Sequence, residues 1–333
     1  MASTTSTSTS SLATADPIVA TVDGSRSPKR RRSGGFRAVW HAIRGNGKAL
    51  TGAILLFVFV VAACFPNLFT SVTKPNERAF GLSLPPSGAH LLGTTSYGQD
   101  VWGQLVWGTR ETLVVAVIAG ALASVLSVLI GVAAAYLGGF ADDVLSLLID
   151  VFLVIPAFPL IIVIAAYANG GNLAVIIGVL VVTGWSYGAR QLRAQALSLR
   201  RRDFLESARV RGERPLYIIV CEILPTMVSL IAANFLGAAL YAVLTAAGLQ
   251  FIGLGSPSSV SWGTMLHWAQ SGEALQTGQA WWIIAPGLCI ALLGAAFALL
   301  NYAFDEISNP ALRPVRRVRT GRLRSTPTRS NDV

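Results

Sequence analysis

The side chains that usually carry catalysis are few and scattered in this sequence. The histidines His41, His90 and His267 are isolated, so none has the partner spacing of a metal site. The Gly-Lys pair at residues 47–48 lacks the first glycine and the Ser or Thr of a phosphate-binding loop. We therefore expect no catalytic residue, no metal and no directly bound cofactor. Any ATP that the protein's work consumes must be hydrolysed by a separate chain.

One segment, residues 190–225, has residue types and a spacing that suggest binding. It contains eight arginines and four acidic residues, and its pattern predicts a helix, a break and a second helix. We expect Asp203 to cap the first helix and Gly212 to end it in a left-handed conformation. Pro215 suits the first turn of the second helix, and Pro225 is expected to end the segment. Such a rigid element could be held by a soluble partner; the alternative is an ordinary charged loop.

Long apolar runs surround this segment and predict an all-α, polytopic membrane protein. The chain of 333 residues is 53% hydrophobic and 13% charged, whereas soluble domains carry about 25% charged residues. A bilayer core needs about 20 apolar residues in a helix. Buried helices of a large soluble core are the alternative, and they seldom stay apolar on all faces for so long. We predict six transmembrane helices, over residues 50–68, 112–137, 144–167, 172–189, 226–249 and 281–304.

The basic residues predict the orientation. Eight of the 26 Lys and Arg residues precede the first predicted span, eight lie in 190–225, and seven follow the last span. Only three lie on the other side, all between the first and second spans. By the positive-inside rule, both termini and the segment 190–225 are expected in the cytoplasm. The basic composition is therefore a topological signal, and we expect no nucleic-acid partner.

Asp150 is the one acidic residue well inside a predicted span, and a mid-membrane charge costs about 2.5–3.5 kcal/mol. Pro156 and Pro159 are expected to kink the same helix. This combination predicts either a bent helix that lines a pathway or a kinked helix that only packs. Because a proton-coupled carrier would need several such charges, a stand-alone ion-coupled carrier is disfavoured.

The predicted organisation has a cytoplasmic tail at each end. Residues 1–49 are Ser/Thr-rich and then basic, and residues 36–48 could form an interfacial helix or a solvated linker. Residues 50–110 contain the first transmembrane helix and an extracellular loop. Residues 111–310 form a five-helix core that includes the loop 190–225, and a basic cytoplasmic tail covers 311–333.

The loop resembles the EAA loop of bacterial ATP-binding-cassette (ABC) importer permeases. That motif has Glu-Ala-Ala, a glycine six residues after the Glu, and Leu-Pro twelve residues later. Glu206, Gly212 and Leu224–Pro225 match this spacing; Ser207 replaces the first alanine and Ala208 keeps the second.

The resemblance implies a coupling helix around residues 206–216, ending at Leu216, that docks into a groove of an ATPase subunit. Glu206 would stabilise the loop or contact that partner, and Gly212 would supply the turn.

Further stretches resemble one subfamily, the dipeptide/oligopeptide/nickel permeases, and within it the subunit with the short first extracellular loop. They occur in the subfamily's order: residues 90–94, 98–100, 108–113, 131–156 and 249–266. The resemblance implies the type I permease fold in a bacterial inner or plasma membrane, embedded in lipid. It also implies a heterodimer with a second permease subunit, two ABC ATPase subunits that use ATP, and an extracytoplasmic substrate-binding protein.

The expected cargo is a di- or oligopeptide that passes through the permease pair. Several residues depart from the subfamily pattern: Thr95 replaces an Asp, Gln99 and Gln104 each replace an Arg, and Ala246 replaces an acidic residue. These departures are at or near the expected external face, so nickel or an oligosaccharide remains an alternative substrate.

Overall fold

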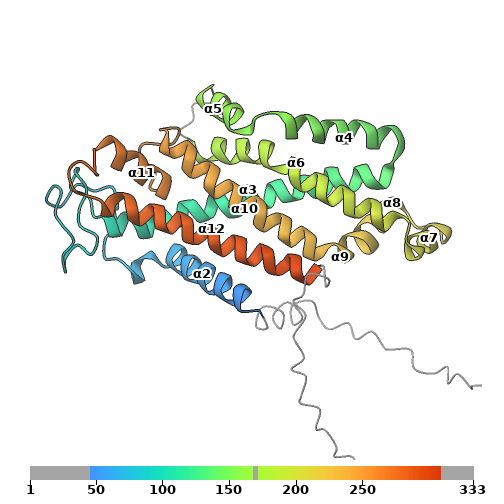
Figure 1. Cartoon of the computed structure of the whole chain (residues 1–333), viewed down its shortest axis with the longest axis horizontal. Coiled ribbons are helices and arrows are strands. Elements are labelled where there is room, and N and C mark those ends of the chain that lie inside the picture. The colour runs from blue at the N-terminus through green and yellow to red at the C-terminus, as the bar shows by residue number, and fades with distance from the viewer. Residues whose placement is uncertain (1–45, 168–171, 309–333) are drawn as a thin grey trace, which may run out of the picture. The chain divides into compact units, whose positions relative to one another are not determined.

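The computed structural model describes residues 46–167 and 172–308, with side chains up to residue 304 (Figure 1). These residues belong to one compact unit, Trp40–Val333. Within them every regular element is a helix, apart from an isolated β-bridge between Thr94 and Asp100. The predicted interfacial helix, over 36–48, falls largely outside the described residues, and the two tails, over 1–49 and 311–333, lie almost wholly outside them.

Five helices are long and apolar enough to cross a membrane, and a bent pair supplies a sixth crossing if it counts as one span. The all-α prediction is therefore confirmed, and five of the six predicted spans each correspond to one long helix, although the first helix ends at Cys64 rather than at 68 and the fifth begins at Val228 rather than at 226. The five are α2 (Gly47–Cys64), α3 (Val101–Leu137), α6 (Leu173–Arg200), α10 (Val228–Phe251) and α12 (Trp281–Ser308). The bent pair is α4 (Gly139–Val154) and α5 (Ala157–Tyr167), which meet at 86°.

The helix α12 continues four residues past its predicted end, and two other helices extend much further beyond their predicted bounds. The helix α3 begins at Val101 rather than at 112, because the Asp100 side chain caps it by accepting a hydrogen bond from Gly103 N at 2.6 Å. The helix α6 continues past 189 to Arg200, so the predicted loop starts later than 190. Residues 190–200 are rich in Arg, Leu, Ala and Gln, which favour helix without being uniformly apolar. Hydropathy marks the apolar part of a helix and not its ends.

Small residues along one stripe of α3 let neighbouring backbones come close. Gly120 lies against α10, and Gly131 lies against the carbonyl oxygen of Ala189 in α6, so neither position has room for a side chain. Between them, the Ser127 hydroxyl donates a hydrogen bond to the carbonyl oxygen of Trp185 at 2.6 Å. The helix α3 thus holds α6 and α10 by close packing, as small residues do in membrane bundles.

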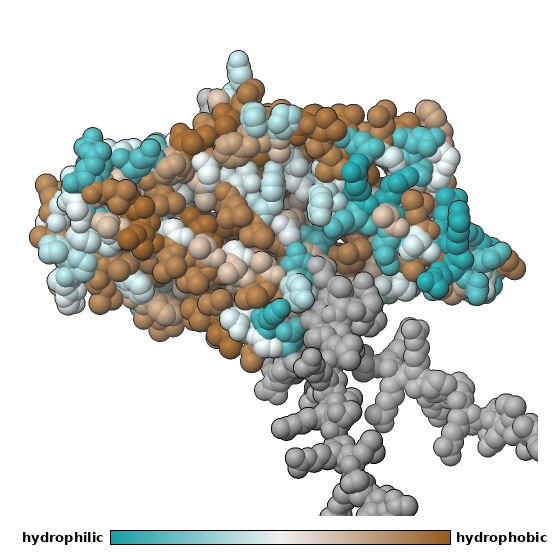
Figure 2. Space-filling model, viewed as in Figure 1, coloured by the Kyte–Doolittle hydropathy of each residue, from teal (hydrophilic) through white to brown (hydrophobic). Residues whose placement is uncertain are grey.

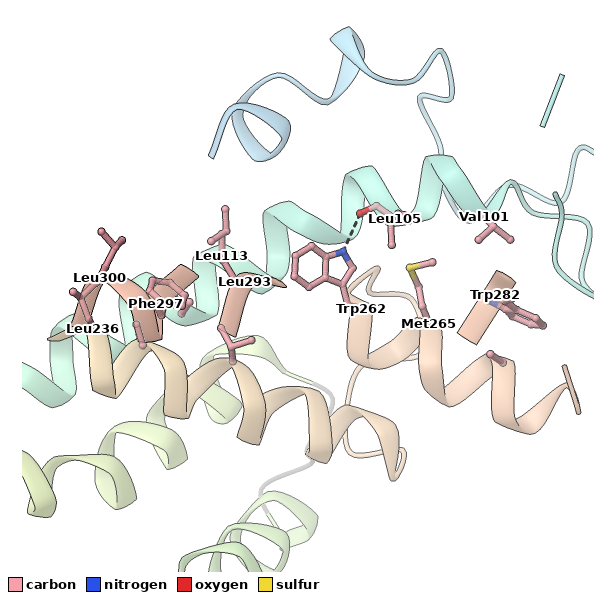
Figure 3. Close-up of a cluster of buried hydrophobic side chains, with 14 of the residues drawn as sticks. Val101, Leu105, Leu113, Leu236, Trp262, Met265, Trp282, Leu293, Phe297 and Leu300 are labelled. Carbon is pink, nitrogen blue, oxygen red and sulfur yellow. Dashed lines mark hydrogen bonds between the residues drawn. The ribbon is translucent and has the colours of Figure 1, made fainter. Parts of the chain in front are cut away.

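A short helix that the sequence analysis did not predict closes one end of the bundle. It is α11 (Trp262–Ser271), and a reciprocal capping box between Ser261 and Thr264 starts it. Trp262 is fully buried, and its indole N–H donates to the carbonyl oxygen of Leu105 at 3.0 Å (Figure 3). Figure 3 shows this tryptophan among leucine, valine and methionine side chains from α3 and α11. We call this the α11 end of the bundle.

The opposite end carries α7 (Asp203–Val210) and is called the α7 end (Figure 1). Hydrophobic residues cover much of the surface between the two ends, and hydrophilic residues gather around α7 and α8 (Figure 2). Large apolar side chains are exposed along the intervening helices, such as Phe57 on α2, Leu129 on α3 and Val163 on α5. An apolar belt between polar ends is the surface expected of a membrane-spanning bundle.

Candidate functional site

The segment after α6 forms a helical hairpin, which we call the α7 hairpin. It consists of α7, a turn at Gly212, the short α8 (Pro215–Tyr217), the π-helix η2 (Ile218–Ile223) and α9 (Leu224–Thr226). Gly212 has φ +76°, which confirms its predicted left-handed conformation. Pro215 lies in the first turn of α8, also as predicted.

Two predictions about the ends of this segment are wrong. The residue that caps α7 is Arg202, which makes no side-chain cap hydrogen bond, and Asp203 is the first helical residue. An acidic side chain in the first turn still favours the helix through the helix dipole. Pro225 does not end the segment, because it lies inside α9 and the chain bends at Met227 instead.

One side of α7 is built into the bundle. Leu205 and Ala208 are fully buried. They pack in one cluster with Val132 of α3, Leu192 of α6 and Ile218 of η2. A movement of α7 must therefore be transmitted to α3 and α6, because densely packed side chains have no room to slip.

The other side of α7 is open to solvent. Glu206, Ser207 and Val210 are exposed, and the Ser207 hydroxyl donates to the carbonyl oxygen of Asp203 at 2.8 Å. The serine that departs from the EAA motif therefore occupies a surface position, whereas the retained Ala208 is buried.

The tip of the α7 hairpin combines apolar and basic groups. Val210 and Leu216 are 85% and 75% exposed. An open groove of about 960 Å³ beside α7 is lined by Glu206 and by three arginines, Arg200, Arg201 and Arg209, together with Leu197, Ser198 and Val210. Exposed apolar side chains within a charged rim are typical of a surface that binds another protein.

Two ion pairs tie α4 to α6. Arg193 makes a bidentate contact with Asp142, at 2.6 Å from Nε to Oδ1 and 2.8 Å from Nη2 to Oδ2. Arg190 pairs with Asp150, whose side chain is 54% exposed. Each of these two carboxylates on α4 therefore has an arginine of α6 as its counter-ion.

The prediction that both prolines kink the third span is right for Pro156 and wrong for Pro159. Pro156 lies at the break between α4 and α5. Pro159 is the third residue of α5, and its missing N–H costs little because the first four N–H groups of a helix have no partner within it.

Beside this break lies a cavity of about 650 Å³ between α4, α5, α6, α10 and α12, which we call the central cavity. Pro156 lines it, but Asp150 and Pro159 do not. Among the described residues, the lining includes no charged side chain, and its polar groups are Thr183, Ser186, Tyr187, Gln191, Asn234, Tyr241 and Asn301. A concave site with a few converging polar groups is the usual form of a small-molecule site.

These polar groups were not predicted, although the sequence contains a signal for those on α6. Thr183, Tyr187 and Gln191 recur every four residues, which places them on one face of α6. Asn234 lies directly against Gly188, where any side chain would collide with it, and its amide donates to the Ser124 hydroxyl at 3.4 Å. The glycine is thus what allows Asn234 to reach the space between α6 and α10.

Three further acidic residues belong to the same helices as the predicted second and third spans. Glu111 is the eleventh residue of α3, just before the predicted span, and Asp142 and Asp143 lie near the start of α4. Asp150 is the one acidic residue of α3 and α4 that lies within a predicted span.

Comparisons with known proteins agree on one class. The profile of the family described as "Binding-protein-dependent transport system inner membrane component" matches residues 127–314. The chain is similar to the dipeptide transport system permease protein DppC of Bacillus subtilis, with 31% identity over 278 residues, covering 82% of this chain and 85% of the relative. It is also similar to the oligopeptide transport system permease protein OppC of Mycobacterium tuberculosis, with 29% identity, covering 83% and 94%.

Proposed function

The chain belongs to the family of inner-membrane components of binding-protein-dependent transport systems, and from this premise we propose that it is a permease subunit of an ABC importer for di- or oligopeptides. The observation that carries the proposal is the α7 hairpin, which is packed into the bundle on one side and exposed on the other. The printed names of the relatives favour a peptide over nickel or an oligosaccharide as the cargo.

The α7 end is the cytoplasmic end in this proposal, and both termini lie on that side. The distribution of Lys and Arg supports this orientation, because Arg190, Arg193 and residues 200–202 all belong to the part of α6 and the following turn that leads to α7. The α11 end then faces the outside, where a substrate-binding protein delivers its cargo.

Four partners complete the machine: a second permease subunit, two ATPase subunits and the binding protein. The ATPases are separate chains, since this sequence has no phosphate-binding loop. Each permease presents its α7 hairpin to one ATPase. Val210 and Leu216 supply apolar contacts there, and the arginines of the groove favour an acidic rim on the partner.

Transport follows an alternating-access scheme with two packed arrangements of the bundle. When the ATPases bind ATP they close and move the α7 hairpin. Leu205 and Ala208 transmit that movement to α3 and α6, and the ion pairs carry it on to α4. The central cavity beside the α4–α5 break forms this subunit's part of the pathway.

Co-purification tests this proposal. The full chain is expressed with its candidate partner subunits, purified through a tag on this chain, and reconstituted in liposomes with the binding protein. We expect a nucleotide-binding subunit to co-purify and tri-alanine uptake to require ATP. Uptake by this chain alone without ATP would instead identify a stand-alone carrier, and the proposal would be wrong.

Replacing Asn234 by leucine tests the role of the central cavity. The two side chains have similar sizes, so packing against Gly188 is largely kept while the hydrogen-bonding groups are lost. Losing one such interaction, worth about 1–2 kcal/mol, predicts peptide uptake about tenfold slower with the ATPase subunits still bound. Leu244→Ile, on the exposed face of the same helix, is the matched control and should leave uptake unchanged. Wild-type uptake by Asn234→Leu would remove this cavity from the pathway.

A further inference from the structure

A second, smaller pocket lies at the α11 end and contains one charged side chain. It has a volume of about 370 Å³ and shares no lining residue with the central cavity. We call it the Glu111 pocket. Its walls come from α3, from the start of α6 and from the segment after α10: Glu111, Asn172, Leu173, Ile176, Ser256 and Ser259.

The Glu111 carboxylate has no basic partner among the described residues. Asp142 and Asp150 each pair with an arginine, and Asp143 is exposed at the start of α4. No Lys, Arg or His nitrogen in the described part of the chain lies within 4.0 Å of Glu111. Glu111 therefore differs from Asp142 and Asp150 in lining a pocket without an ionic partner among the described residues.

Buried neighbours hold this carboxylate in place. Gln250 is only 4% exposed, and its Oε1 accepts a hydrogen bond from the Ser261 hydroxyl at 2.7 Å. This bond orients the Gln250 amide so that its Nε2 points toward Glu111. The distance from Gln250 Nε2 to Glu111 Oε1 is 3.5 Å. Gly263 makes the arrangement possible, because a Cβ there would lie 2.5 Å from Gln250 Oε1.

The start of α6 forms part of the wall of this pocket. The helix begins at Leu173, and the Asn172 side chain caps it by accepting from Ala174 N at 2.9 Å. The positive end of the α6 dipole therefore lies at the pocket wall. Half a charge at a helix end does not neutralise a full carboxylate, so the pocket keeps a negative character.

Among the described residues of the pocket wall, the other polar side chains are Asn172, Ser256 and Ser259, which supply neutral oxygens. One carboxylate with amide and hydroxyl oxygens suits an ammonium group, which has three donors and a single charge. A divalent metal would require more anionic oxygens than the pocket offers.

We propose that the Glu111 pocket binds the ammonium group of a peptide at the external end of the permease. This inference rests on the proposed function, because it takes the α11 end as the side from which peptides arrive. The pocket selects for a positive charge before the cargo meets the uncharged central cavity.

Binding to the full chain in nanodiscs, without the binding protein, tests the pocket directly. The probes are tri-alanine and N-acetyl-tri-alanine, which differ in the ammonium group, and their affinities are measured by saturation-transfer difference NMR. Losing one charged hydrogen bond, worth about 1.5–3 kcal/mol, predicts that Glu111→Gln weakens tri-alanine binding by about tenfold or more. Binding of the acetylated peptide should not change.

Two further variants make the result specific. Glu111→Asp keeps the charge and should retain part of the affinity, and Glu77→Gln removes an exposed acid elsewhere and should have no effect. An equal loss for both peptides in Glu111→Gln would show a structural role and overturn the inference. Competition by sodium at constant ionic strength would assign the pocket to an inorganic cation and also overturn it.

The inference and the proposed function can fail separately. ATP-driven uptake of tri-alanine with no change of binding in Glu111→Gln would leave the proposed function standing and remove the pocket. Charge-selective binding without ATP-driven uptake would support the Glu111 pocket and contradict the proposed function.

Discussion

Replacing Gly212 by valine abolishes peptide uptake, while the protein still inserts in the membrane. Gly212 has φ +76° at the turn that follows α7. A β-branched residue is strongly disfavoured there, at a cost of about 1–2 kcal/mol or more. A Cβ at this position would meet no atom within 4 Å, so the effect arises from the backbone conformation and not from crowding.

The turn fixes the direction in which the exposed tip is presented. The N–H of Gly212 donates to the carbonyl oxygen of Arg209 at 2.9 Å, and the N–H of Glu213 donates to that of Ala208 at 3.2 Å. A valine that adopts negative φ breaks these bonds and redirects Leu216. We therefore expect the variant to lose the proposed contact between the hairpin tip and an ATPase subunit.

Uptake in proteoliposomes and co-purification of the ATPase are the measurements. Gly178→Val in α6 is the matched control, because Gly178 also has open space around it but lies within a regular helix. Gly212→Asn should retain much of the uptake, since asparagine tolerates the left-handed conformation. Full uptake by Gly212→Val would show that the hairpin does not act as a lever.

Reversing the charge of Arg193 produces the second large effect. The Arg193–Asp142 pair is bidentate, and its side chains are only 29% and 15% exposed. Arg193→Glu leaves two facing carboxylates between α4 and α6, and breaking a buried pair costs about 3–5 kcal/mol. Discounted for the partial exposure, the loss should still lower the melting temperature and stop uptake.

A double variant separates the pair from its surroundings. Arg193→Asp combined with Asp142→Arg restores opposite charges and should recover part of the stability and uptake. Recovery stays incomplete because residue 142 lies in the first turn of α4, where the helix dipole favours an acid.

The neighbouring pair provides the matched control. Arg190 and Asp150 are more than half exposed, so Arg190→Gln should cost at most about 1 kcal/mol. The double variant Arg193→Asp/Asp142→Arg provides the decisive outcome. If its melting temperature is as low as that of Arg193→Glu alone, the ion pair does not stabilise the contact between α4 and α6.

The sequence by itself determined the features that depend on neighbouring residues. Runs of about 20 apolar residues predicted the spans, because transfer into lipid is decided by local hydrophobicity. Gly212 and Pro215 predicted the turn and the start of α8, because both restrict the backbone directly. The family resemblance of the EAA segment likewise needed only the spacing of a few residues.

The tertiary structure alone decided which distant residues meet. Arg193 pairs with Asp142, which is 51 residues away in the sequence. Asn234 has room beside the central cavity only because the residue opposite it, Gly188, has no side chain. The extension of α3 made Glu111 part of that helix, and the fold placed this residue beside Gln250. Hydropathy measures how each residue partitions into lipid, whereas these contacts depend on how helices pack, and packing is a property of the whole bundle.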